Sequence, residues 1–218
     1  MFIVEKKPKS ISAEAYKSLR TNIQYSSFDN EYKIIVVTSS EPGEGKSTTS
    51  GNLAIVLAQG ESKVLLIDCD MRKPTLHKRF KLTNTNGLSD LLHCKNKMSL
   101  ESISFKYNNN LNIITSGKIP PNPSEMLASK AMSNFLEEMK EKFDYIILDT
   151  PPIHAVTDSQ VLARKADGVL LVVRANKTKK ELVNNSIKSI KKINANLIGV
   201  VLNGVDNSSN KYYQYYGE

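Results

Sequence analysis

A glycine-rich loop between two regular elements constrains this chain more than any other feature. The loop, residues 39–48, reads SSEPGEGKST and follows an apolar run, residues 34–37, that is typical of a buried strand. Residues 52–58, which come next, have the composition of a helix. Glycines let consecutive backbone N–H groups point into one concavity, and the helix N-terminus adds its positive dipole end. The order strand, glycine turn, Gly-Lys-Ser and helix therefore predicts a phosphate-binding loop.

Two side chains of this loop have predicted roles beside a bound nucleotide. Lys46 would reach the β- and γ-phosphates, and the Ser47 hydroxyl would ligate Mg²⁺. The usual pattern begins with Gly five residues before Gly45, where this chain has Ser40, and a small residue still fits there. The predicted nucleotide contacts in the loop are Ser40, Gly43, Glu44, Gly45, Lys46, Ser47 and Thr48. The alternative is a simple turn with a surface lysine.

Length and composition fit one globular domain. The chain has 218 residues, of which 40% are hydrophobic and 24% charged, so it is long enough for a full core. The net charge of +8 would suit a nucleic acid or a membrane surface. No nucleic-acid-binding motif accompanies the charge, so we expect no nucleic-acid partner. We assign the basic residues of segments 72–81 and 177–192 to phosphate handling and to a solvated helix face.

The compartment is predicted from what the sequence lacks. No apolar run approaches the roughly 20 residues of a membrane helix, and the first residues carry no signal-peptide core. The two cysteines, Cys69 and Cys94, do not have the spacing of metal ligands. We therefore expect a reduced, cytoplasmic setting.

Apolar strands alternate with amphipathic helices along the chain, which predicts a mostly parallel sheet covered by helices on both faces. The expected strands are residues 33–38, 63–68, 111–115, 144–148, 168–173 and 197–202. The expected helices are residues 12–27, 52–59, 87–92, 124–129, 131–141, 158–165 and 178–193. The fold class is thus α/β of the P-loop NTPase kind, with a single domain over residues 1–205. Residues 206–218 form an Asn/Ser- and Tyr-rich tail that we expect to be mobile.

Three acidic residues lie at predicted strand ends: Asp68, Asp70 and Asp149. With Lys46 and Ser47 they would make a nucleotide–Mg²⁺ site, in which Asp149 holds the ion. Phosphoryl transfer also needs a group that takes the proton of the acceptor, and Asp68 and Asp70 are the candidates. The alternative for any strand-end Asp is a helix cap.

Charged residues recur every three positions on the expected first helix: Glu14, Lys17 and Arg20. Local ion pairs on a solvated face would explain them, and a subunit contact is the sharper hypothesis. Two further segments stand out, the proline-rich loop 117–123 and the tail KYYQYYGE, residues 211–218.

Four segments together closely resemble the bacterial tyrosine kinases of capsule and exopolysaccharide synthesis. They read IDCDMRKP (residues 67–74), GKIPPNPSEML (117–127), EAYKSLRTNI (14–23) and the tyrosine tail. The resemblance extends from about residue 10 to the tail. It implies ATP and Mg²⁺ as cofactors, a Walker A match at residues 40–47, a Walker A′ match at residues 68–74 and a Walker B match at residues 146–150.

The resemblance also implies roles and partners. In that family the first A′ Asp, here Asp68, is catalytic and the second, Asp70, helps to hold Mg²⁺. Tail tyrosines, here Tyr212, Tyr213, Tyr215 and Tyr216, are phosphorylated mainly by a neighbouring subunit. The Glu14, Lys17, Arg20 strip matches a Glu-x-x-Arg-x-x-Arg helix that builds a ring homo-oligomer, with Lys in place of the middle Arg.

The stand-alone form of these kinases rests on the inner face of the plasma membrane through a transmembrane activator, a polysaccharide co-polymerase, and a tyrosine phosphatase opposes it. Each tail phosphate would add about −1.5 to −2 charges, which predicts that phosphorylation releases the ring.

Two rival functions are weighed against this one. An ATPase switch of the partitioning or division-site type shares the fold, but it usually has a signature lysine where this chain has Glu41. A non-catalytic regulator that only binds ATP would not need the three carboxylates. Two roles stay open: Asn203 either hydrogen-bonds adenine or forms a turn before Gly204, and Arg72 contacts phosphate or a neighbouring subunit. His77 is expected to be a surface residue of a basic helix.

Overall fold

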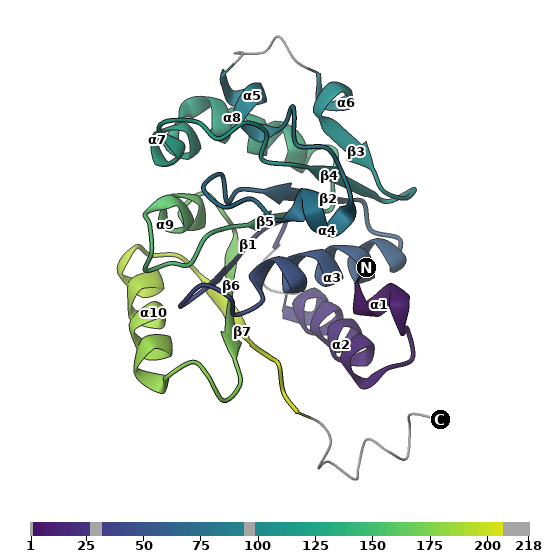
Figure 1. Ribbon diagram of the computed structural model, residues 1–218, viewed down its shortest axis with the longest axis vertical. Helices are drawn as coiled ribbons and strands as arrows, with labels where there is room; N and C mark the ends of the chain where they lie inside the picture. Colours follow the sequence, from purple (N-terminus) through teal and green to yellow (C-terminus); the bar gives the residue numbers. More distant parts are fainter. Residues whose placement is uncertain (1, 27–31, 94–98, 207–218) are drawn as a thin grey trace.

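The fold is a seven-stranded sheet in the order β3-β4-β2-β5-β1-β6-β7 (Figure 1). The computed structural model describes residues 2–26, 32–93 and 99–206. The strands are β1 (Ile34–Ser39), β2 (Val64–Asp68), β3 (Ser104–Lys106), β4 (Leu111–Ile114), β5 (Tyr145–Asp149), β6 (Gly168–Arg174) and β7 (Leu197–Asn203). Only the pairing of β3 with β4 is antiparallel. The predicted, mostly parallel α/β sheet is confirmed.

Helices cover both faces of the sheet. They are α1 (Ile3–Lys6), α2 (Ile11–Ser26), α3 (Lys46–Gln59), α4 (Leu76–Phe80), α5 (Leu88–His93), α6 (Leu100–Ile103), α7 (Pro123–Ala128), α8 (Lys130–Lys140), α9 (Asp158–Ala163) and α10 (Lys180–Lys192). Figure 1 shows α2 and α3 on one side of the strands and α9 and α10 on the other. None of the helices within the described ranges is both long and apolar enough to cross a membrane.

The central strands are buried on both faces, which explains their continuous apolar runs. In β1, Ile35 and Val37 pack in the core beneath α2 and α3. Ile34 and Val36 point the opposite way, into the core beneath α8 and α9. Successive side chains of a strand alternate between faces, so one short run contributes to two cores.

Three short elements were not predicted, namely α1, α6 and β3, and α4 was expected only as a basic helix around His77. Each has three to five residues, which is too few to show a period of 3.6 or 2. In α4 only Leu76 and Phe80 are buried, and His77 is half-buried rather than fully on the surface. The predicted tail tyrosines, Tyr212, Tyr213, Tyr215 and Tyr216, lie outside the described residues, as does Cys94.

Candidate nucleotide and phosphotransfer site

The sheet order brings the predicted site residues together. Strands β2, β5 and β1 are neighbours, and in a parallel sheet their carboxyl ends meet at one edge. Val37, two residues before the end of β1, pairs with Asp149, and Asp149 pairs with Asp68 on its other side. The glycine-rich loop after β1 therefore lies beside two of the three predicted carboxylates.

The loop has the backbone geometry that its glycines predict. Gly43 and Gly45 have φ angles of 81° and 101°, in the region that L-residues with a Cβ rarely adopt. Ser40 is not among the residues with positive φ. It is 2% exposed, and its hydroxyl accepts a hydrogen bond from Ser186 at 2.8 Å. The position of the first consensus glycine thus accommodates Ser without backbone strain.

Glu44 braces the loop from within. Its side chain is only 3% exposed. One carboxylate oxygen accepts the backbone N–H groups of Ser40 at 2.8 Å and Glu41 at 3.1 Å, and the other accepts the hydroxyl of Thr178. Sequence reasoning placed Glu44 in the loop but did not find this role, because its partner Thr178 is remote in sequence.

Asn203 supports the same loop from the end of β7. Its Nδ2 donates to the backbone oxygen of Glu44 at 2.9 Å, and its Oδ1 accepts the N–H of Gly204 at 2.9 Å. The second bond is the predicted turn before Gly204. Both polar atoms of the side chain are therefore engaged within the chain, and the adenine contact stays a prediction.

The loop offers unused donors to an anion. Lys46 begins α3 and is 9% exposed, and it makes no ion pair with the residues that the structure describes. Within the same ranges, the backbone N–H groups of Gly43 and Gly45 donate to no protein atom. These donors converge at the N-terminus of a 14-residue helix, which is the arrangement that binds phosphate.

Asp149 has the environment of a cation ligand. It is completely buried, its Oδ1 accepts the Ser50 hydroxyl at 3.0 Å, and its Oδ2 is buried without a hydrogen-bond partner. Burial raises its pKa to about 6, while the nearby Ser47 hydroxyl and the charge of Lys46 act in the opposite direction. The Ser47 hydroxyl also accepts a hydrogen bond from Thr75 at 2.8 Å. An unpaired carboxylate oxygen beside a serine hydroxyl fits Mg²⁺, which takes one or two carboxylates plus phosphate oxygens.

Asp68 and Asp70 hold the loop that follows β2. Asp68 accepts backbone N–H groups from Asp70 at 3.2 Å, Thr75 at 3.0 Å and Leu76 at 2.9 Å, so the helix-cap role also exists. Burial, followed by the charge of Asp149, raises the pKa of Asp68 well above its usual range. Burial also raises the pKa of the half-buried Asp70, which accepts the Lys73 N–H at 3.0 Å. Carboxyl groups with raised pKa values are suited to accept a proton.

The predicted oligomer strip on α2 divides into two parts. Glu14 and Lys17 are solvent-accessible and form a local ion pair at 2.7 Å. Arg20 instead turns inward, where its Nη1 donates to the backbone oxygen of Val56 at 2.9 Å and its Nε is buried without a partner. Arg20 therefore caps the C-terminal turn of α3 within its own subunit.

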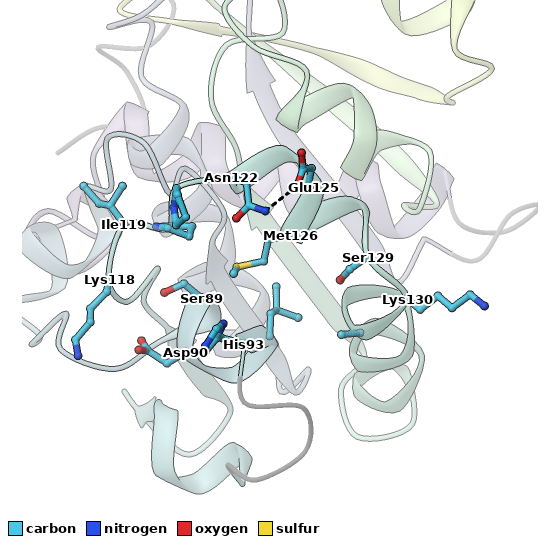
Figure 2. Close-up of a pocket in the computed structure, with 14 residues that line it drawn as sticks. Ser89, Asp90, His93, Lys118, Ile119, Asn122, Glu125, Met126, Ser129 and Lys130 are labelled. Carbon is cyan, nitrogen blue, oxygen red and sulfur yellow. Dashed lines mark hydrogen bonds between the residues drawn. The ribbon is translucent and has the colours of Figure 1, made fainter.

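A separate pocket of about 830 Å³ lies next to the proline-rich loop, away from the glycine-rich loop. Figure 2 shows its walls, with Ser89 and Asp90 of α5 on one side and Glu125 and Met126 of α7 on the other. None of the predicted site residues lines this pocket.

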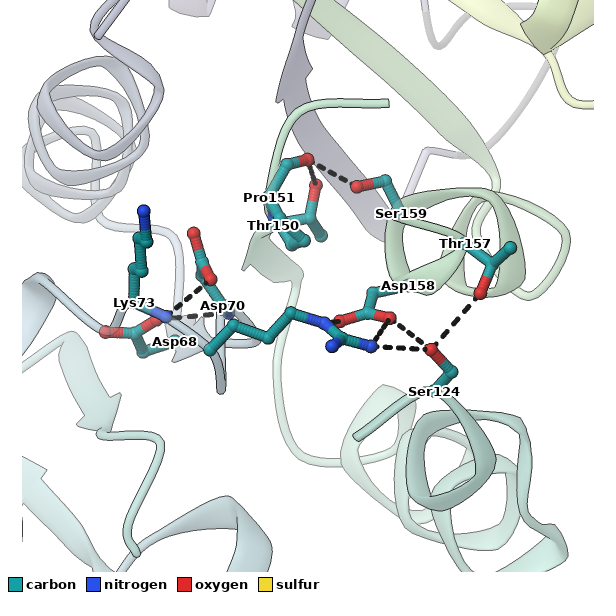
Figure 3. Close-up of polar contacts among 10 residues, drawn as sticks. Asp68, Asp70, Lys73, Ser124, Thr150, Pro151, Thr157, Asp158 and Ser159 are labelled. Atoms are coloured by element: carbon teal, nitrogen blue, oxygen red, sulfur yellow. Dashed lines mark hydrogen bonds and ion pairs between the residues drawn. The ribbon is translucent and has the colours of Figure 1, made fainter. Parts of the chain in front are cut away.

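Arg72 has a partner that the sequence did not indicate. Its guanidinium forms an ion pair with Asp158, with Nε 2.9 Å from Oδ2. Figure 3 shows Asp158 close to Ser124 and Thr157, with Asp68 and Asp70 separated from this group. The Arg72 side chain therefore has a partner within its own chain, without a phosphate or a second subunit. Asp158 lies in the first turn of α9, where acidic residues are common, so its position alone does not mark it as half of an ion pair.

Comparison with known proteins gives the family. Residues 32–200 match the family described as AAA domain (AAA_31). Tyrosine-protein kinase YwqD of Bacillus subtilis is 45% identical over 210 residues, which are 96% of this chain and 88% of that protein. Putative tyrosine-protein kinase CapB of Staphylococcus aureus is 42% identical over 216 residues, covering 99% and 94%. The solved kinase domain of the Escherichia coli tyrosine kinase ETK has a TM-score of 0.90 at 33% identity, covering 97% of this chain and 82% of that one.

The rival ATPase class is less similar. A plasmid partition protein from Borrelia burgdorferi has a TM-score of 0.63 at 25% identity, covering 85% of this chain and 95% of its own. Both the sequence identity and the TM-score are therefore higher for the kinases than for the partition protein. The ATP-binding loop is common to the two classes. The chain belongs to the bacterial tyrosine-protein kinases, which are ATP-dependent transferases built on the AAA_31 domain.

Proposed function

We propose that this kinase is an autokinase of capsule and exopolysaccharide synthesis. It transfers the γ-phosphate of ATP to its tail tyrosines, Tyr212, Tyr213, Tyr215 and Tyr216, mainly from one subunit to the next. The observation that carries the proposal is the meeting of Lys46 and Ser47 with Asp68 and Asp149 at the ends of adjacent strands. A protein that only bound ATP would not need carboxylates with raised pKa values beside the phosphate loop.

The residues at this edge have distinct proposed tasks. Lys46 and the loop N–H groups of Gly43 and Gly45 bind the β- and γ-phosphates and neutralise their charge. Ser47, Asp70 and Asp149 would hold Mg²⁺, which supplies further charge neutralisation on the transferring phosphoryl group. Their oxygens fit this ion because the Oδ2 atom of Asp149 is buried and otherwise unpaired.

The proton of the acceptor tyrosine needs a base. Asp68 is fixed by three backbone N–H groups and is fully buried. We assign it the acceptance of the tyrosine hydroxyl proton, with Asp70 as the more accessible carboxylate between metal and acceptor. Because both pKa values are raised, each carboxyl group binds a proton more readily than an exposed one does.

The proposal includes assembly of the kinase into a ring and its placement at the membrane. Glu14 and Lys17 are accessible on α2 for a ring contact with a second copy. Arg20 already donates to the Val56 oxygen of α3 through Nη1, so it would join that contact only through the rest of its guanidinium group. A transmembrane activator, the polysaccharide co-polymerase, would place the kinase at the inner face of the plasma membrane, and a tyrosine phosphatase would reverse its action.

Mixing two variants, neither of which can phosphorylate its own tail, tests transfer between subunits. One chain carries Lys46→Met with an intact tail, and the other is catalytically intact with all four tail tyrosines changed to Phe. We expect phosphotyrosine on the tail of the Lys46→Met chain after addition of Mg²⁺-ATP. A mixture in which both chains carry Lys46→Met is the control. ATP hydrolysis without phosphotyrosine in the mixture would instead favour an ATPase switch.

A further inference from the structure

The Arg72 side chain connects two loops that carry proposed metal ligands. Its Nε donates to Oδ2 of Asp158 at 2.9 Å and its Nη2 donates to Oδ1 at 3.2 Å. Two parallel N–H···O bonds between a guanidinium and a carboxylate fix both distance and orientation, which a single contact does not. Arg72 lies two residues after Asp70 on the loop that follows β2, and Asp158 begins α9 after the loop that follows β5.

Asp158 is buried and has further hydrogen-bond partners besides Arg72. Its side chain is 0% exposed, whereas that of Arg72 is 41% exposed. The Ser124 hydroxyl donates to the same Oδ1 atom, and it accepts hydrogen bonds from Nη2 of Arg72 at 3.1 Å and from the Thr157 hydroxyl at 3.1 Å. Ser124 belongs to α7, which follows β4. Loops from three neighbouring strands, β4, β2 and β5, are thus joined at one point (Figure 3).

This junction opposes a repulsion at the site. Asp68 is paired with Asp149 across β2 and β5, and Asp70 follows Asp68 by two residues, so three carboxyl groups meet at this edge of the sheet. Without a cation the like charges favour separation of the two loops. The only direct backbone link between them among the described residues is the Cys69 N–H to the Asp149 oxygen, at 2.8 Å. The Arg72–Asp158 pair adds a second link on the far side of Asp70.

We propose that Arg72 and Asp158 are a pair of positioning residues for the metal site. Their ion pair sets the spacing between the loop that carries Asp70 and the loop that leaves β5 at Asp149, so that both carboxylates reach one Mg²⁺. The inference rests on the proposed function, in which Ser47, Asp70 and Asp149 hold that ion. It assigns Arg72 to work through Asp158, rather than by direct contact with phosphate or with a second subunit.

Nucleotide binding with and without metal tests the pair. The variants are Arg72→Gln, Asp158→Asn and the two combined, and the readout is the affinity for a fluorescent ADP in EDTA and at increasing Mg²⁺. We expect each single variant to raise the Mg²⁺ midpoint about tenfold, a typical effect of residues that orient metal ligands. The affinity in EDTA should stay within about twofold, and the combined variant should be no worse than the worse single one, because the two residues act as a unit.

Two further variants separate positioning from loss of fold. Arg72→Lys keeps the charge but loses the fork, so it should give an intermediate midpoint. Lys142→Gln removes a solvent-exposed ion pair, with Glu138 at 2.6 Å at the end of α8, and should leave the midpoint unchanged. Thermal melts identify any variant that does not fold. If Asp158→Asn is one of these, Arg72→Lys and Ser124→Ala provide the test, and an unchanged midpoint in both overturns the proposal.

Several results would contradict the proposal. Additive effects in the combined variant would mean that Arg72 acts independently of Asp158. An unchanged midpoint in Asp158→Asn, or a nucleotide affinity of the unaltered chain that does not respond to Mg²⁺, would also overturn it. The binding readout needs no phosphoryl transfer. A chain that forms no phosphotyrosine would therefore refute the proposed function, while the Mg²⁺ midpoints still decide on the pair.

Discussion

The Nδ2 atom of Asn203 lies only 1.9 Å from the place that a Cβ atom on Gly45 would take. The same nitrogen donates to the backbone oxygen of Glu44 at 2.9 Å. The end of β7 therefore fills the space beneath the phosphate loop, and the chain continues from there toward the tyrosine tail. Glycine is required at position 45 for two independent reasons, its φ of 101° and its contact with Asn203.

Replacing Gly45 by Ala should abolish nucleotide binding, because the new Cβ atom must displace Asn203 and the residue must keep a left-handed φ. Asn203→Ala alone should cost about 1 kcal/mol of unfolding free energy for the lost hydrogen bond. Titration with fluorescent ADP and urea unfolding check both. The double variant removes the contact but not the backbone strain. Full recovery of nucleotide binding in the double variant would show that backbone strain at position 45 does not contribute to the loss of binding.

Removing Glu44 should weaken the nucleotide site, because its carboxylate is bonded to the loop itself and to Thr178. Glu44→Ala leaves the backbone N–H groups of Ser40 and Glu41 unpaired, at a cost of about 1–3 kcal/mol for bonds to a charged acceptor. We expect a lower unfolding midpoint and at least about tenfold weaker ATP binding, since every 1.4 kcal/mol is tenfold. Glu41→Ala, at the neighbouring exposed position, is the matched control. Equal effects of the two substitutions would refute the bracing role.

Asp149→Asn should stabilise the metal-free protein at neutral pH. The pKa of Asp149 is about 6 in the folded chain and about 3.9 in an unfolded one. Between these values the folded state binds more protons, so its stability falls as pH rises from about 4 to 6. Asn removes that loss, which we expect to be on the order of 3 kcal/mol at pH 7.5.

Urea unfolding in EDTA at pH 4.5 and pH 7.5 measures this change, and the variant should show a smaller difference between the two than the unaltered chain. The buried Asp68 carboxyl group also has a raised pKa and makes stability fall with rising pH, so the variant will keep part of the pH dependence of its stability. The variant should nevertheless lose Mg²⁺-dependent phosphotransfer. A variant that is less stable than the unaltered chain at pH 7.5 would contradict the assigned cost of the buried charge.

Arg20 and Lys17 should differ although they lie one helical turn apart. Arg20→Ala removes the cap on the Val56 carbonyl and should cost about 1 kcal/mol at any protein concentration. Lys17→Ala removes an exposed pair and should change the monomer by less than about 0.5 kcal/mol. Unfolding at two dilutions, with native mass spectrometry for the oligomer, separates the roles. If Arg20→Ala and Lys17→Ala destabilised the dilute monomer equally, the role of Arg20 in capping α3 would be refuted.

The sequence predicts those parts of the molecule that depend on local patterns. The loop around Lys46, the strand before it and the helix after it share one segment, and Asp68 and Asp149 follow recognisable apolar runs. Sheet order then brings them together without further information. What the sequence does not show depends on distant partners.

Arg72 and Asp158 are 86 residues apart, and no local pattern marks either as half of a pair. Arg20 was placed by helical spacing on a charged face. Its long side chain nevertheless reaches back to α3, since the aliphatic stem of Arg can lie along apolar surface. The short helix α4 depends on the burial of Leu76 and Phe80, and β3 depends on its pairing with β4, rather than on periodicity.

One measurement tests the central claim most directly. The purified chain is incubated with Mg²⁺-ATP, alone and with the cytoplasmic segment of a cognate activator, and phosphorylated residues are mapped by mass spectrometry. Phosphotyrosine among Tyr212, Tyr213, Tyr215 and Tyr216, absent in Lys46→Met, is the predicted result. ATP hydrolysis without any phosphotyrosine, even with the activator present, would contradict it.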